Sequence, residues 1–176
     1  MSFIIYGLKE GSKILTDKGY IPIQDLRKGD LVKTLKHEYK AVDMIGYAEM
    51  YNPNIDERIE DQLYVCSQEQ YPEIFENLIV MGCNSSLIDL FQNEMQKLFV
   101  KTILGKIYTT DNKYRLPAFL DDRASIYKNK GNFMIYNIAL ENNDYYMNYG
   151  IYANGLLVES CSKRFLEKLS KMTLLK

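Results

Sequence analysis

The sequence contains no tryptophan and a single histidine, His37, among its 176 residues. Histidine is the side chain that most often moves protons near neutral pH, so acid–base chemistry has few groups to work with here. Cysteine is scarce as well. Cys66, Cys83 and Cys161 form an odd, widely spaced set, which argues against a disulfide framework or a zinc site. We therefore expect neither a metal ion nor any other cofactor.

Long apolar runs and an excess of one charge are also absent. No stretch approaches the roughly 20 apolar residues that cross a bilayer. The net charge is -1, with acidic and basic residues mixed along the chain. These features favour neither a membrane nor a nucleic acid as a partner. The N-terminal residues MSFIIYGLKEG lack the basic region and the apolar length of a signal peptide, so a cytoplasmic location is expected. A protein partner and the oligomeric state cannot be inferred from the sequence.

The composition is typical of a chain rich in β-strands. It includes 15 tyrosines and many β-branched residues, which are enriched in strands. A length of 176 residues is enough for one domain with a hydrophobic core, and no linker or repeat interrupts the chain. We therefore predict a single all-β domain over residues 1–176.

Short apolar stretches separated by Gly, Asp and Asn predict strands joined by tight turns. The clearest strands are expected at residues 3–5, 13–16, 31–35, 133–140 and 156–159. Asn154 and Gly155 predict a tight hairpin turn, and His37 is expected at the solvated tip of another. Residues 86–104 fit either a helix or a broken strand, and the spacing of apolar residues does not decide between them. A C-terminal helix is predicted at about 162–176, with Ser162 as its cap.

Two stretches in the chain resemble known sequence blocks. GSKILTDKGYIPIQDLRKGDLVKT, residues 11–34, resembles the first block of Hint domains, the autoprocessing modules shared by inteins and hedgehog proteins. YNIALENNDYYMNYGIYANGLLVES, residues 136–160, resembles the terminal Hint blocks. Residues 45–130 match only loosely. The closest resemblance is to the Hint-like proteins of large DNA viruses, which would place the chain in a host cytoplasm or a virion.

This resemblance implies a Hint fold, a folded-over β architecture with an internal pseudo-twofold axis. In such a fold the two chain ends lie in adjacent central strands, and tight turns bring the first residue of the domain next to its last. We therefore expect Gly7 to lie near Cys161, with the turn at residues 82–84 close by. The activity that the resemblance implies is autocatalytic peptide-bond cleavage or protein splicing.

The positions that match the catalytic residues of the family are mostly substituted here. They are Gly7, Met81, Asn84, Asn137, Ser160 and Cys161. Gly7 stands where the family has a nucleophilic Cys or Ser, and so cannot start an acyl shift. Met81 and Asn84 replace the Thr and His that act on the leaving amide. Ser160 lacks the side-chain amide with which a terminal Asn cyclises.

The leading hypothesis is a degenerate Hint domain without catalytic activity, retained as a structural or protein-interaction module. The alternative is an active self-cleaving or splicing domain with a variant mechanism that uses Cys161 or Cys83. A third hypothesis, an engineered replacement of a native cysteine by Gly7, ranks lower because one change would not also alter Met81 and Asn84. If only the catalytic groups are missing, Gly7→Cys with Met81→Thr and Asn84→His could restore thiol-dependent release of an N-terminal flank.

Overall fold

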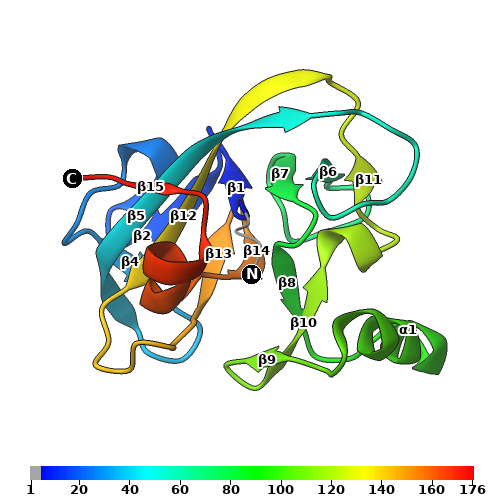
Figure 1. Ribbon diagram of the computed structural model, residues 1–176. Helices are drawn as coiled ribbons and strands as arrows, with labels where there is room; N and C mark the ends of the chain where they lie inside the picture. Colours follow the sequence, from blue (N-terminus) through cyan, green and yellow to red (C-terminus); the bar gives the residue numbers. More distant parts are fainter. Residues whose placement is uncertain (1–4) are drawn as a thin grey trace.

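The computed structural model of the protein describes residues 5–176, and its strands form one continuous hydrogen-bonded network (Figure 1). The prediction of a mostly β fold is confirmed. The strands are β1 (Leu8–Lys9), β2 (Lys13–Thr16), β3 (Gly19–Pro22), β4 (Leu31–Lys33), β5 (Tyr39–Asn52), β6 (Leu63–Cys66), β7 (Leu78–Met81), β8 (Ser85–Ile88), β9 (Thr109–Thr110), β10 (Lys113–Pro117), β11 (Ser125–Ile126), β12 (Gly131–Leu140), β13 (Gly150–Ala153), β14 (Leu156–Glu159) and β15 (Thr173–Leu174). Residues 3 and 4 of the strand expected at 3–5 lie outside the described residues.

Two long antiparallel strands, β5 and β12, run across the molecule and connect its two sides (Figure 1). The first part of β5 pairs with β4, on the side that carries β2 and β13. On the other side of the molecule, β1 pairs with both β12 and β7. The beginning of the chain is thereby inserted between two strands that come from much later in the sequence. The pseudo-twofold axis expected from the resemblance stays a prediction.

The region left undecided by the sequence divides into a strand and a helix. After β8, the helix α1 (Glu94–Leu104) begins at Asn93, whose side chain accepts a hydrogen bond from the backbone N–H of Gln96. It ends at Gly105 with a positive φ of 87°. An Asn cap and a left-handed glycine are common helix boundaries, and here they delimit a helix that the apolar spacing alone could not establish.

The C-terminal helix is shorter than the predicted range of 162–176. Helical residues run only from 163 to 169, including a π-helical turn at Phe165–Leu169. The chain then extends, and Thr173 and Leu174 pair as β15 with Tyr47 and Gly46 of β5. On this edge of β5, the strand β4 pairs only with the first residues, Tyr39 to Ala41. The backbone N–H and C=O groups further along the edge therefore need another hydrogen-bonding partner. Pairing with this edge, together with burial of Met172, replaces the end of the expected helix.

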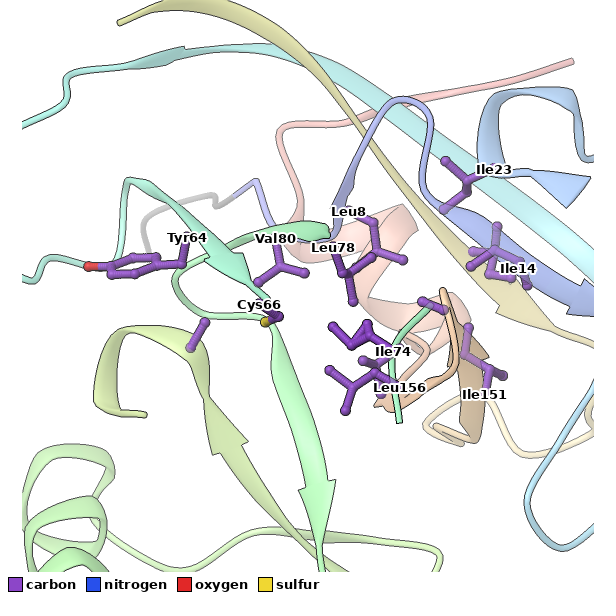
Figure 2. Close-up of a cluster of buried hydrophobic side chains, with 14 of the residues drawn as sticks. Leu8, Ile14, Ile23, Tyr64, Cys66, Ile74, Leu78, Val80, Ile151 and Leu156 are labelled. Carbon is purple, nitrogen blue, oxygen red and sulfur yellow. The ribbon is translucent and has the colours of Figure 1, made fainter. Parts of the chain in front are cut away.

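Buried side chains from both ends of the chain share the main hydrophobic core. Leu8 and Ile14 from the N-terminal strands pack in one cluster with Leu78, Ile151 and Leu156 (Figure 2). The Asn154–Gly155 turn closes this core, as the sequence predicted, with positive φ values of 48° and 95°. A Cβ on Gly155 would lie 2.3 Å from the carbonyl oxygen of Glu73, so the turn also packs tightly against the loop before β7.

One arginine organises the loop that precedes β11. The guanidinium of Arg58 donates hydrogen bonds to the backbone carbonyls of Phe119, Ala118, Asp121 and Ala124 at 2.8–3.0 Å. It also stacks 4.8 Å from the ring centre of Tyr64. A planar group with five donors suits such a cluster of carbonyl oxygens, and a lysine could not reproduce it.

Candidate functional site

The segment around Gly7 is held between β7 and β12. The carbonyl oxygen of Gly7 accepts a hydrogen bond from the backbone N–H of Met81 at 3.0 Å. The carbonyl oxygen of the preceding Tyr6 accepts one from the side-chain amide of Asn137 at 2.9 Å. The peptide bond between Tyr6 and Gly7 therefore lies among three of the positions that the sequence singled out.

The end of the chain reaches the same strand. The backbone N–H of Cys161 donates to the carbonyl of Ile138 at 3.1 Å, and its thiol lies 3.2 Å from the same oxygen. Ile138 follows Asn137, whose side chain holds Tyr6. Gly7 and Cys161 thus lie against adjacent residues of β12, which is the meeting of chain ends expected from the resemblance.

Gly7 has no room for a side chain. Its φ is +149°, and a Cβ added there would lie 2.2 Å from the carbonyl oxygen of Tyr136 and 3.1 Å from the Cβ of Asn137. Any L-residue would require β1 and β12 to move apart. The Gly7→Cys rescue considered from the sequence therefore has no space in this structure, because the missing nucleophile would collide with the backbone.

Asn84 follows β7 and lies one hydrogen bond from Met81, whose carbonyl accepts from the Asn84 N–H at 2.9 Å. Its side-chain oxygen is buried and, among residues 5–176, has no hydrogen-bond partner. The same is true of the Ser86 hydroxyl. Both residues line a small internal cavity of about 10 Å³ with Cys66 and Asp121. An amide carries no proton that it can release near neutral pH, so Asn84 cannot act as the acid that the family has there.

Ser160 is fully buried and its hydroxyl has a structural partner. The hydroxyl oxygen accepts from the backbone N–H of Tyr149 at 3.0 Å, while the Ser160 N–H donates to the Tyr149 carbonyl at 2.8 Å. These two hydrogen bonds fix the backbone immediately before Cys161. The side chain thus secures the end of β14.

Burial raises the pKa of all three thiols. Burial raises the pKa of Cys66 to about 12. Burial, with Glu60 as the next cause, raises the pKa of Cys83 well above its usual range. Burial and the nearby Glu159 carboxyl do the same for the pKa of Cys161. Because the thiolate is the reacting species, a raised pKa lowers the fraction of each thiol that is in the reacting form at neutral pH.

Glu159 is a member of this site whose importance the sequence did not reveal. Burial raises the pKa of its carboxyl to about 7, against the opposing effects of Arg115 and Asn148. The carboxylate oxygen lies 2.9 Å from the Arg115 Nε. The pKa of this carboxyl therefore lies near neutral pH. The position of Glu159 in the sequence, directly before Ser160 and Cys161, was the available signal.

His37 lies at a hairpin tip between β4 and β5, as expected, and its side chain is 45% exposed. The ring packs edge-on against Tyr149 at a centroid distance of 5.2 Å, and its Nε2 lies 3.8 Å from the buried carboxylate of Asp111. Among the described residues, no hydrogen bond joins His37 to a thiol. The Cys–His pair that a variant mechanism would need is therefore not formed.

Comparison with known proteins relates the first third of the chain to one family. Residues 6–65 match the family model described as "Hint domain". Over this stretch, the chain is similar to a Hint domain. The match includes Gly7, β1 and the whole of β5, while Met81, Asn84, Asn137, Ser160 and Cys161 lie beyond it. No curated protein matches the sequence.

Three solved structures give more distant similarity. The gp41-1 intein is 12% identical with a TM-score of 0.46, covering 88% of this chain and 98% of that one. The Ssp DnaB mini-intein variant M86 is 10% identical with a TM-score of 0.47, covering 92% and 97%. A bacterial intein-like domain from Clostridium thermocellum is 12% identical with a TM-score of 0.45, covering 91% and 99%.

Within residues 5–176, no group of three or more His, Cys, Asp or Glu side chains is placed to hold a metal ion. Over the same range, no helix combines the length and the apolar character needed to cross a membrane.

Proposed function

We propose that the chain is a single Hint-like domain of the autoprocessing class that no longer cleaves peptide bonds and serves as a structural or protein-interaction module. The observation that carries this proposal is the packing at Gly7. The space that a nucleophilic side chain would occupy is filled by the carbonyl of Tyr136, 2.2 Å from the position of a Cβ. Gly7 therefore differs from the nucleophilic residue of the family in its backbone packing as well as in the lost thiol or hydroxyl.

The surrounding groups support the same reading. The acid position is an amide, Asn84, and the residue before the downstream cysteine is Ser160, whose hydroxyl is bonded to Tyr149. Two or more missing catalytic groups each cost about 10²–10⁴ in rate, although such losses do not simply add. The positive φ of Gly7 also favours a native glycine over an engineered replacement of cysteine. A viral origin and a cytoplasmic location remain predictions from the sequence.

The rival function is cleavage by a variant mechanism with Cys161 or Cys83. It is tested on the full chain fused to unrelated flanking sequences at both ends. After incubation at neutral pH with and without added thiol, we expect intact mass spectrometry to give the mass of the uncut fusion alone. Products split at Tyr6–Gly7 or at Ser160–Cys161 would overturn the proposal.

Two matched variants identify the source of any cleavage. Cys161→Ala and Cys83→Ala each remove one thiol without supplying a hydroxyl in its place, and leave the other thiol unchanged. Loss of cleavage in only one of them would assign the nucleophile and establish the variant mechanism. An active intein fusion treated in parallel shows that the conditions permit thiol-dependent release. An uncut fusion of this chain then indicates that the chain itself does not cleave.

A further inference from the structure

The helix α1 presents apolar side chains on two faces, of which only one is covered. Val100 is fully buried and Leu104 is partly buried against the core, so these residues attach the helix to the domain. On another face, Met95, Leu98 and Phe99 are 73%, 58% and 53% exposed. Their spacing, continued by Ile103, is the i, i+3, i+4, i+8 pattern of a helix that packs against a partner.

The helix lies at the periphery of the molecule, where a partner can reach it (Figure 1). Beside it, Phe99 and Ile103 line a groove of about 520 Å³ with Phe119 and Leu120 of the neighbouring 3₁₀ turn. Leu90, just before the helix, is 81% exposed. A surface that includes a helix face, an apolar groove and a neighbouring leucine is larger than the scattered apolar residues found on most monomers.

The size of this surface fits a protein–protein contact. We define the α1 surface as Leu90, Met95, Leu98, Phe99 and Ile103. At about 200 Å² for a fully exposed large side chain, their exposed fractions amount to roughly 600 Å² of accessible area. Since an interface is about 60–65% apolar, the complete contact would cover roughly 900 Å² on each side, close to the ~800 Å² per partner of a standard interface.

The charges beside the α1 surface favour a second copy of the same chain. Glu94 and Lys101 are both exposed, stand two helical turns apart on one flank of α1, and form no ion pair within residues 5–176. In an antiparallel pair of helices, Glu94 of each copy comes next to Lys101 of the other, and the helix dipoles also oppose each other. The chain carries a net charge of only -1, so two copies repel each other weakly.

We propose that the α1 surface is a homodimer interface in which the α1 helices of two copies pack antiparallel across a twofold axis. This inference does not rest on the proposed loss of catalysis. The other basic residue that could join the contact, Lys97, stacks 5.5 Å from the ring centre of Tyr114 in its own chain. Glu94 and Lys101 are therefore the charged pair that the dimer would use, twice by symmetry.

Sedimentation velocity on the full chain tests the proposal. We expect a dimer at micromolar concentrations, within the range that interfaces of this size span. Leu98→Glu should raise the dissociation constant by at least ~30-fold, since a charge would be buried at the centre of the contact. Tyr51→Glu is the matched control, because Tyr51 is 51% exposed on the distant strand β5 and its replacement should leave the dimer intact.

Charge reversal tests the antiparallel arrangement. Glu94→Lys places two lysines side by side at each end of the contact and should weaken the dimer ~3–10-fold at low salt. Adding Lys101→Glu exchanges the two signs and should restore the original dissociation constant to within ~2-fold. Far-UV circular dichroism on each variant verifies that the fold is retained, which these exposed positions favour.

Each outcome decides the proposal. A wild-type chain that remains monomeric at high micromolar concentration refutes it and leaves the α1 surface to a different protein. A dimer that tolerates Leu98→Glu has its interface elsewhere, which also refutes it. A dimer that Leu98→Glu breaks, but that the double charge exchange does not restore, excludes the antiparallel pairing.

Discussion

Replacing Gly7 by alanine is expected to destabilise the fold far more than the same change at Gly11. Both residues have a positive φ, +149° and +97° respectively, a conformation that costs an alanine about 1–3 kcal/mol. They differ in their surroundings. A Cβ at Gly11 meets nothing within 4 Å, whereas a Cβ at Gly7 would lie 2.2 Å from the Tyr136 carbonyl oxygen.

The additional cost at Gly7 follows from the contacts that must open. A separation of 2.2 Å is about 1 Å shorter than the ~3.3 Å of a close carbon–oxygen contact. To relieve it, β1 has to move away from β12, which strains the hydrogen bonds of Tyr6 with Asn137 and of Gly7 with Met81. At about 1 kcal/mol for each bond plus the backbone term, Gly7→Ala should cost ~3–5 kcal/mol. Gly11→Ala should cost only the backbone term of ~1–3 kcal/mol, because no contact has to open there.

Urea unfolding of the wild type and the two variants, followed by circular dichroism, measures both changes. If Gly7→Ala falls below its folding threshold, the three proteins are compared in a stabilising osmolyte, which shifts all of them together. A difference between the two variants of less than about 1 kcal/mol would refute the reasoning. In that case β1 can move at little cost, and the lack of space at Gly7 would no longer argue against a nucleophile there.

Two other predictions concern charged side chains inside the domain, the buried Glu159 and the partly buried Arg58. The folded-state pKa of Glu159 is about 7, above its unfolded value, so the folded protein binds the proton more tightly. The contribution of this group to the unfolding free energy should therefore be greatest below about pH 4.5 and fall by up to ~3 kcal/mol as the pH rises to about 7. Urea unfolding at several pH values measures this change, and the unfolding free energy of Glu159→Gln should vary less with pH. Arg58→Lys should cost ~2–4 kcal/mol, because it loses most of four hydrogen bonds to backbone carbonyls. Arg164 is the control, because its guanidinium stacks on the exposed Tyr146. Arg164→Lys should change the unfolding free energy by less than about 1 kcal/mol. If both variants lost a similar amount of stability, the role given to Arg58 would be wrong.

The strands near the two chain ends could be predicted from local sequence because their signals are local. At Asn154–Gly155, both turn residues need a positive φ, which these two residue types supply at low cost. The regular spacing around Lys13–Thr16 and Leu156–Glu159 likewise predicts strands that are present. The predicted C-terminal helix at 162–176 is too long, since the pattern of its last residues also suits a strand. The free edge of β5 decides between the two.

The sequence by itself determined the mostly β class, the hairpin at Asn154–Gly155 and the absence of a nucleophile at Gly7, because these depend on residue type and immediate neighbours. Only the tertiary structure decided that Gly7 has no space for a side chain, that burial raises the pKa of Glu159 to about 7 and that α1 keeps an uncovered apolar face. Each of these depends on strands or loops that are distant in sequence. Steric exclusion, desolvation and exposure are properties of what lies next to a residue in space, and the order of residues along the chain does not state them.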